Sequence, residues 1–363
     1  MLIGVDASRT TVSRRTGTEA YALNLIRALL AAGQADGEDQ HRRWRLYFRE
    51  SPNPDLLPHS EHIEHKIIRL PMLWTHLGLA AEIARRPPEL LFIPAHVRPL
   101  WSKAPAVVTV HDLGYLHFPE SHPRRQRAYL DWSTKHSARH CQHLIADSQA
   151  TRADLIEHYR VPLQNVTVIY PGFDPQPFVG EFQRPAGLPA EYLLYVGTIH
   201  PRKGLLQLLA AFSNVPEAPT LLLVGNPGWL SAPIYQSVQE LKLEGRVRFL
   251  GYVPDSELPA LYRHAHAFVF PSFYEGFGFP ILEAFAAGTP VLCSDGGSLP
   301  EVAGEAALIV PAGEVGTLSN GLQRILSDRD LRAGLVERGH EQLKNFSWEK
   351  AAAETLQLFE SVL

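Results

Sequence analysis

Short apolar runs alternate with longer amphipathic stretches along this chain, and the alternation forms two successive series. An apolar or β-branched run followed by a helix-length stretch predicts a βα unit, and repeated units predict a parallel sheet. Each series therefore predicts a doubly wound, Rossmann-like α/β domain. The expected strands are 2–5, 44–48, 90–93, 106–110, 143–146 and 166–169 in the first series, and 192–196, 221–224, 247–250, 267–270, 291–293 and 307–310 in the second.

A stretch rich in proline and glycine, 170–189, separates the two series. At 363 residues the chain also exceeds the usual size of a single core. We therefore predict an N-terminal domain over 1–175 and a C-terminal domain over 176–345. The segment 346–363 is expected to be a helix with Ser347 as its N-cap.

Composition narrows the functional classes. The chain is 45% hydrophobic and 20% charged with a formal charge of −4, so we expect a globular protein and no nucleic-acid partner. Cys141 and Cys293 have no metal-ligand spacing and are expected to be buried thiols in a reducing compartment. No apolar run reaches the roughly 18 residues needed to span a bilayer, and no charged leader precedes the first strand. We expect a cytoplasmic location, with peripheral contact at the inner face of the membrane left open.

The stretch from Glu275 to Glu283 follows an expected strand and combines two glycines, a proline and two carboxylates. Glycines let the backbone approach a ligand closely, and Pro280 suits the first turn of a helix. Such a loop can hold a sugar and a diphosphate together. Glu275 would accept hydrogen bonds from sugar hydroxyls, the amides of 279–281 would face phosphate oxygens, and Glu283 would accept from ribose hydroxyls. A plain glycine turn into a helix with acidic ends is the alternative.

Arg202 and Lys203 follow the strand 192–196 and precede Gly204, which opens the next expected helix. A diphosphate leaving group gains negative charge as the glycosidic bond breaks, and two fixed cations stabilise that charge. They would take the place of a metal ion. The alternative is a pair of solvated surface cations.

Two further positions are candidates in the first domain. His111 ends the strand 106–110 and is a candidate for contacting the donor sugar or holding its leaving geometry, although a lone histidine is often structural. Asp112 is more typical of a turn cap. Gly17 precedes an amphipathic helix whose N-terminus could approach a phosphate or the acceptor, and Glu19 fits a first-turn acid equally well.

Together these motifs resemble the GT4 family of retaining glycosyltransferases. The resemblance rests on the two glutamates with seven residues between them, the Gly-Phe-Gly-Phe-Pro core, the turn 196–204 and the Val-His-Asp-Leu motif at 110–113. It implies the GT-B fold, with two Rossmann-like domains facing across a cleft and the last helix packed on the first domain. Many members carry arginine after the first glycine of the turn, but Thr198 follows Gly197 here.

The resemblance also implies a reaction and a set of contacts. The expected activity is a metal-independent transfer of a hexose from a nucleotide sugar, with retention and without a cofactor. The base would be held near Gly225 and Val253. The expected catalytic residues are His111, Arg202, Lys203 and Glu275, and the expected donor contacts are Gly17, Gly197, Arg202, Lys203, Gly225, Val253, Glu275, Gly276, Phe277, Gly278, Phe279, Pro280, Ile281 and Glu283.

The substrates stay open at the level of sequence. GDP-mannose is the preferred donor because the residues after His111 and the Pro-Arg-Lys-Gly turn resemble the mannosyltransferase branches, and a UDP-sugar of the glucose type is the alternative. The acceptor is a glycan, a lipid-linked saccharide or a small molecule. A nucleotide-sugar-binding protein and a nucleotide-sugar isomerase are the rival functions.

Three remaining segments bear on metals and membranes. Asp328-Arg-Asp330 matches the Asp-x-Asp pattern that binds a divalent cation in transferases of another fold. Here we expect it to cap a helix, and we expect no metal. The segment 123–140 is rich in arginine with Tyr129 and Trp132 interleaved, so it suits either a solvated face or anionic lipid headgroups. The apolar segment 70–79 fits a membrane or acceptor lip, or the core.

Overall fold

The computed structural model describes residues 1–12, 17–35, 42–58, 60–95 and 97–363. These residues form two compact units: unit 1 contains Met1–Leu113, Arg124–Gly172 and Phe346–Leu363, and unit 2 contains Gly114–Pro123 and Phe173–Asn345. The chain enters unit 2 for the second time after Gly172, at the edge of the proline- and glycine-rich stretch. The excursion of 114–123 into unit 2 was not expected from the sequence.

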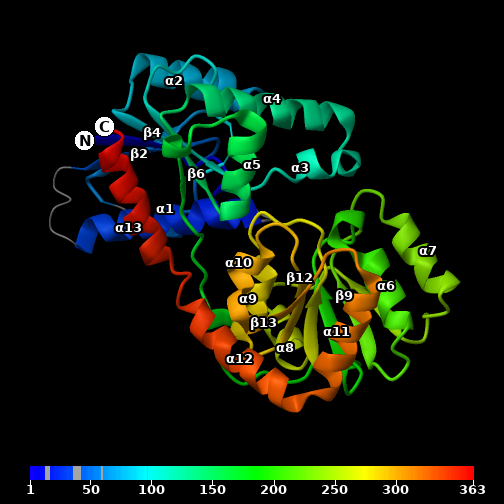
Figure 1. Ribbon diagram of the computed structural model, residues 1–363. Coiled ribbons are helices and arrows are strands. Elements are labelled where there is room, and N and C mark those ends of the chain that lie inside the picture. Colours follow the sequence, from blue (N-terminus) through cyan, green and yellow to red (C-terminus); the bar gives the residue numbers. More distant parts are fainter. Residues whose placement is uncertain (13–16, 36–41, 59, 96) are drawn as a thin grey trace. The chain divides into compact units, whose positions relative to one another are not determined.

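Unit 1 is built on a seven-stranded parallel sheet in the order β3-β2-β1-β4-β5-β6-β7. The order reverses beside β1, so right-handed crossovers put α1 on one face and α2, α4 and α5 on the other (Figure 1). Helix α13 lies on the same face as α1 and packs against it. The elements are β1 Leu2–Asp6, α1 Gly17–Ala35, β2 Arg43–Phe48, η2 Pro54–Leu56, β3 Ile63–Ile67, η3 Trp74–Leu79, α2 Ala80–Arg85, β4 Leu90–Ile93, β5 Ala106–Val110, α4 Arg124–His140, β6 His143–Ala146, α5 Gln149–Tyr159, η5 Leu163–Asn165, β7 Val166–Val168 and α13 Trp348–Ser361.

The last helix, α13, completes the core of unit 1. It packs along α1, and the Phe359 ring lies 5.2 Å from the Phe92 ring of β4. Ser347 caps α13, with its side chain accepting a hydrogen bond from Lys350 N at 3.1 Å, as its sequence position predicts. A Cβ on Gly172 would lie 2.2 Å from Trp348 N, so the chain entering unit 2 passes directly against the start of α13.

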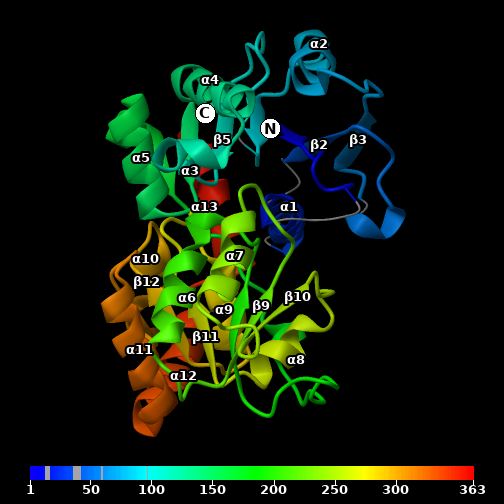
Figure 2. The same cartoon turned by 90° about the vertical axis from the view of Figure 1, so that its right-hand side faces the viewer.

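Unit 2 has a six-stranded parallel sheet in the order β10-β9-β8-β11-β12-β13. Helices α6, α7 and α11 cover one face, and α8, α9, α10 and α12 cover the other (Figure 2). The elements are α3 Gly114–His117, η4 Pro119–Ser121, η6 Gln176–Phe178, β8 Tyr192–Val196, η7 Pro201–Lys203, α6 Leu205–Ser213, β9 Thr220–Val224, α7 Ala232–Glu240, β10 Val247–Gly251, α8 Leu258–Arg263, β11 Ala267–Phe270, α9 Phe279–Ala286, β12 Val291–Ser294, α10 Leu299–Ala303, η8 Gly304–Ala306, β13 Ala307–Val310, α11 Val315–Ser327 and α12 Arg329–Leu343.

The predicted pair of doubly wound parallel domains is therefore what the chain forms. Residues of the inner strands of both sheets are almost wholly buried, because helices cover both faces, and this explains their continuous apolar runs. Asp328 accepts a hydrogen bond from Leu331 N at 2.8 Å, which makes it the N-cap of α12 as expected. Within the described ranges, no helix has the length and apolar character needed to cross a membrane.

Candidate active site

The predicted donor-binding positions of unit 2 gather at one edge of its sheet. Gly197 follows β8, Gly225 follows β9, Val253 follows β10 and Glu275 follows β11. These four strands are neighbours in the sheet and run in parallel, so their carboxyl ends lie along one edge. Ligands bind at this edge in doubly wound folds.

Close backbone approach explains two of the glycines at this edge. Gly204 has φ +68°, and a Cβ there would lie 2.0 Å from Pro271 O. Gly225 has φ +140°, and a Cβ there would lie 2.0 Å from Gly197 O. Any side chain would push the loops after β8, β9 and β11 apart.

The turn that carries the two cations is held by a histidine. Arg202 N donates to His200 Nδ1 at 3.1 Å, so this nitrogen is an acceptor and His200 caps the short helix η7. Burial, together with the charges of Arg202 and Lys203, lowers the pKa of His200, which keeps the ring neutral and able to accept. Phe273 N then donates to Arg202 O at 2.9 Å and joins the turn to the loop after β11.

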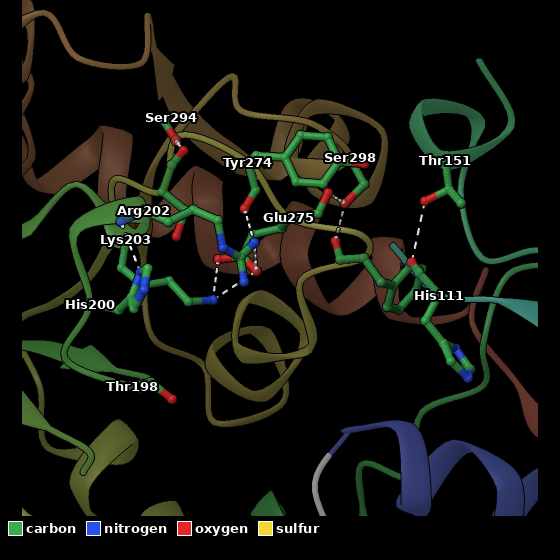
Figure 3. Close-up of polar contacts among 12 residues, drawn as sticks. His111, Thr151, Thr198, His200, Arg202, Lys203, Tyr274, Glu275, Ser294 and Ser298 are labelled. Atoms are coloured by element: carbon green, nitrogen blue, oxygen red, sulfur yellow. Dashed lines mark hydrogen bonds and ion pairs between the residues drawn. The ribbon is translucent and has the colours of Figure 1, made fainter. Parts of the chain in front are cut away.

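Both cations point to Glu275 or its loop (Figure 3). Lys203 Nζ lies 2.6 and 2.8 Å from the two carboxylate oxygens of Glu275. Arg202 donates to Tyr274 O at 2.5 Å, and its guanidinium lies 3.8 Å from Glu275 Oε2. Burial opposes ionisation of Glu275, but Lys203 and Arg202 outweigh it and hold the pKa of this carboxyl below its usual value. Glu275 is therefore a carboxylate at neutral pH.

A second loop supports the backbone around Glu275. Ser298 N donates to Glu275 O at 3.1 Å, and Ser298 Oγ lies 3.0 Å from Glu275 O and 2.6 Å from Phe277 O (Figure 3). The segment 114–123 also packs here, with the His117 ring stacked on Tyr274 at 4.5 Å. Sequence reasoning missed these supports because their partners lie far away along the chain.

The N-terminus of α9 offers fewer amides than predicted. Gly276, Phe277 and Gly278 lead into it, and Gly278 takes φ +111°. Pro280 has no N–H, and Ile281 N already donates to Gly278 O at 3.0 Å. Of the three backbone positions 279–281 that were predicted to face a phosphate, the N–H of Phe279 is therefore the one that remains as a candidate donor.

Glu283 lies on the first turns of α9 and has a partner that the sequence did not reveal. Tyr262 OH donates to Glu283 Oε2 at 2.7 Å. Burial raises the pKa of Glu283 to about 7, against the lowering effect of the Tyr262 hydrogen bond. Glu275 and Glu283 thus differ in protonation behaviour although both belong to one loop and helix.

His111 belongs to unit 1, where both ring nitrogens have partners. Nε2 lies 2.8 Å from Pro94 O and Nδ1 lies 2.6 Å from Asp147 Oδ2. A carbonyl oxygen only accepts, so Nε2 carries a proton and donates it. Burial disfavours the imidazolium, but Asp147 outweighs it and raises the pKa of His111, while burial raises the pKa of Asp147. The hydrogen bond between Nδ1 and Oδ2 therefore joins a histidine and an aspartate whose pKa values are both raised.

The remaining predicted residue of unit 1 is Gly17, which is the exposed first residue of α1. Two residues later, Glu19 is buried and pairs with Arg9 at 3.3 Å. Residues 13–16, which directly precede Gly17, lie outside the described residues.

A parallel-sheet edge that carries two anchored cations and a buried carboxylate has the chemistry to bind an anionic ligand with hydroxyl groups. The chain belongs to the Glycosyl transferases group 1 and Glycosyltransferase Family 4 families, which match residues 181–342 and 15–177. It is therefore a glycosyltransferase, as the motif resemblance implied.

Named relatives and solved structures agree with this family. O-antigen chain mannosyltransferase B of Escherichia coli is 36% identical over 70% of each chain. D-inositol 3-phosphate glycosyltransferase of Corynebacterium efficiens is 29% identical over 72% of this chain and 67% of that protein.

Among solved structures, sucrose-phosphate synthase from Thermosynechococcus elongatus has a TM-score of 0.75 and is 25% identical, covering 99% of this chain and 98% of that chain. Anabaena HepE, in complex with UDP and glucose, has a TM-score of 0.72 at 20% identity and covers 99% of both chains. The fold is GT-B, as expected.

Proposed function

We propose that this glycosyltransferase moves mannose from GDP-mannose to a hydroxyl group of a glycan or lipid-linked saccharide, with retention and without a metal ion. The observation that carries the proposal is the cluster of Arg202, Lys203 and Glu275 at the carboxyl edge of the unit 2 sheet. The kinship with an O-antigen chain mannosyltransferase supports mannose and a saccharide acceptor.

In the proposed function the two cations act on the diphosphate of the donor. Arg202 is fixed by Tyr274 O and Lys203 by Glu275, so neither cation needs to be ordered when a ligand arrives. Both are largely buried, where a charge acts more strongly than in water. In the proposed reaction they stabilise the charge that collects on the departing phosphate, which is the task a metal ion performs in other transferases.

The two glutamates would hold hydroxyl groups at opposite ends of the donor. Glu275 is ionised and can accept from the hydroxyls of the hexose. Glu283 would accept from the ribose, and Phe279 N–H would face a phosphate oxygen. Gly197, Gly225 and Val253 would border the nucleotide at the ends of their strands.

The proposed roles in unit 1 are positional. Because both nitrogens of His111 are engaged, we assign the ring to holding the end of β5 in place rather than to a direct sugar contact. Thr151 Oγ donates to His111 O at 3.3 Å and fixes the same strand end (Figure 3). Gly17 remains a proposed contact to phosphate or acceptor.

Retention is proposed to follow front-face attack. Both oxygens of Glu275 are bound to Lys203, which makes this carboxylate a poor nucleophile. In the proposed step the bond from the anomeric carbon to the phosphate oxygen breaks, the acceptor oxygen bonds to the same face of that carbon, and the phosphate oxygen takes the acceptor proton. The one-bond coupling between C1 and H1 of the transferred sugar, read from the NMR spectrum of the product, gives its anomeric configuration. An inverted configuration would refute retention and, with it, front-face attack.

Thermal shift with a panel of GDP-, UDP- and ADP-sugars tests the donor, because a ligand that binds the folded state raises the melting temperature according to its affinity. We expect GDP-mannose to give the largest shift and to support transfer to a saccharide acceptor. A larger shift and faster transfer with UDP-glucose would replace mannose by the glucose-type alternative.

A further inference from the structure

Helix α4 of unit 1 has its polar and aromatic faces reversed relative to an ordinary surface helix. The residues that it buries include Ser133, Thr134 and Ser137, whereas Tyr129 and Trp132 are 46% and 42% exposed. A helix of a globular protein places its large apolar side chains toward the core. The reversal leaves two amphipathic rings exposed on α4, a helix that lies in the same layer as α2 and α5 (Figure 2).

These rings are held in place by their neighbours. The Tyr129 and Trp132 rings lie 5.9 Å apart, and the Trp132 ring stacks on His136 at 5.9 Å. His76, from the π-helix η3, lies 3.4 Å from Tyr129 OH and 5.7 Å from the Trp132 ring. Side-chain rings that are already ordered lose little conformational freedom when they bind another surface.

The segment that contains His76 also exposes apolar side chains. Met72, Leu73 and Leu77 are all exposed. Leu73 takes φ +54°, a left-handed conformation that leucine rarely adopts. Trp74 is buried and donates to Ile68 O at 2.8 Å, which anchors this segment to the unit.

Cations border the apolar surface on α4. Arg124, Arg125, Lys135 and Arg139 are exposed. The acidic residue of the helix, Asp131, accepts a hydrogen bond from Tyr159 OH at 2.8 Å. The border is therefore positive, although the chain as a whole carries −4.

We propose that this aromatic–basic face, formed by Met72, Leu73, Leu77, Tyr129 and Trp132 with the four exposed cations of α4, docks on an anionic lipid bilayer. Tyrosine and tryptophan prefer the boundary between headgroups and acyl chains, and aliphatic side chains prefer the region below it. Arginine and lysine attract anionic headgroups. A soluble glycan would stack on the rings but would gain nothing from the apolar side chains of Met72 and Leu73. A second copy of this chain would present the same positive face and would be repelled by the first.

Vesicle flotation tests the proposal with the full chain. We expect wild type to float with vesicles of phosphatidylglycerol and phosphatidylcholine, and to stay in solution with phosphatidylcholine alone. The variant Tyr129→Ser/Trp132→Ser should lose at least tenfold in partition, and Arg125→Gln/Lys135→Gln/Arg139→Gln should lose the preference for anionic lipid. Trp229→Ser in unit 2 is the matched control, because Trp229 is 58% exposed, and it should behave as wild type.

Circular dichroism and transfer to a soluble acceptor should be unchanged in the face variants, since these residues lie on the surface and outside the proposed donor contacts. This separates failure of the docking proposal from failure of the proposed function. Absence of wild-type flotation on anionic vesicles, or undiminished flotation of Tyr129→Ser/Trp132→Ser, would overturn the proposal. So would self-association that Trp132→Ser abolishes while no vesicle binding occurs.

Discussion

Lys203 Nζ contacts both carboxylate oxygens of Glu275, at 2.6 and 2.8 Å, and both side chains are largely buried. The pair joins the turn after β8 to the loop after β11, so one interaction fixes two of the proposed donor-binding elements. Removing one member of a buried pair leaves an uncompensated charge. Single substitutions here should therefore affect folding as well as activity.

A double-mutant cycle measures this coupling. We expect Lys203→Met and Glu275→Leu each to lower the free energy of unfolding by about 3 to 5 kcal/mol, and the double variant to lose far less than the sum. Urea denaturation followed by circular dichroism supplies the four values. Additive losses would show that the two side chains do not interact in solution.

Gly204→Ala should disrupt the cation turn. The added Cβ would meet Pro271 O at a backbone position with φ +68°, so we expect a loss of at least about 2 kcal/mol in unfolding free energy and a large fall in transfer rate. Gly316→Ala is the control, since a Cβ there meets nothing within 4 Å on helix α11, and it should be neutral or slightly stabilising. Equal stability of the two variants would contradict the described turn.

Glu283 should make stability fall as pH rises. Its pKa in the folded state, about 7, exceeds the ordinary value of about 4.3 in the unfolded chain, so the folded state binds more protons between these limits. Glu283→Gln keeps the shape without the titration and should remove a slope worth up to about 3 kcal/mol across that window. Unfolding free energies from pH 4 to 8 provide the comparison, and parallel curves for the two proteins would refute the raised pKa.

Asp147→Asn tests the effect of Asp147 on the pKa of His111 in unit 1. The substitution removes the anion that raises the pKa of His111 but leaves the ring buried, so that pKa should fall below the usual histidine value. NMR titration of histidines labelled at Cε1 would follow the change, with the assignment made through His111→Gln. An unchanged pKa in Asp147→Asn would mean that Asp147 does not govern the ring.

Most strands that were predicted correctly are buried on both faces, because burial on both sides produces an uninterrupted apolar run. The edge strands β7, β10 and β13 are only partly buried, but they keep enough apolar residues to be recognised. The strand β3, Ile63–Ile67, was missed because it lies at the sheet edge, where Glu64, His65 and Lys66 are tolerated between the isoleucines. The excursion of 114–123 into unit 2 was also missed, since it depends on packing such as that of His117 on Tyr274.

The proposed donor-binding residues could be nominated from sequence because glycines, cations and carboxylates follow strands at a common edge. The side chains that hold these residues in place could not be predicted from the sequence. His200 as a cap, Tyr262 beside Glu283 and Ser298 beneath Glu275 are side chains without a motif, and each acts through a contact that only the folded chain creates.

Donor binding to a variant that lacks the Lys203–Glu275 pair but keeps the fold tests the central proposal most directly. Lys203→Met/Glu275→Leu removes both members of the closest ion pair together, and Arg202 keeps its hydrogen bond to Tyr274 O. By isothermal titration calorimetry, we expect wild type to bind its nucleotide sugar and the double variant to bind at least a hundredfold more weakly. Equal affinities would show that the ligand is held elsewhere and would contradict the proposed donor site.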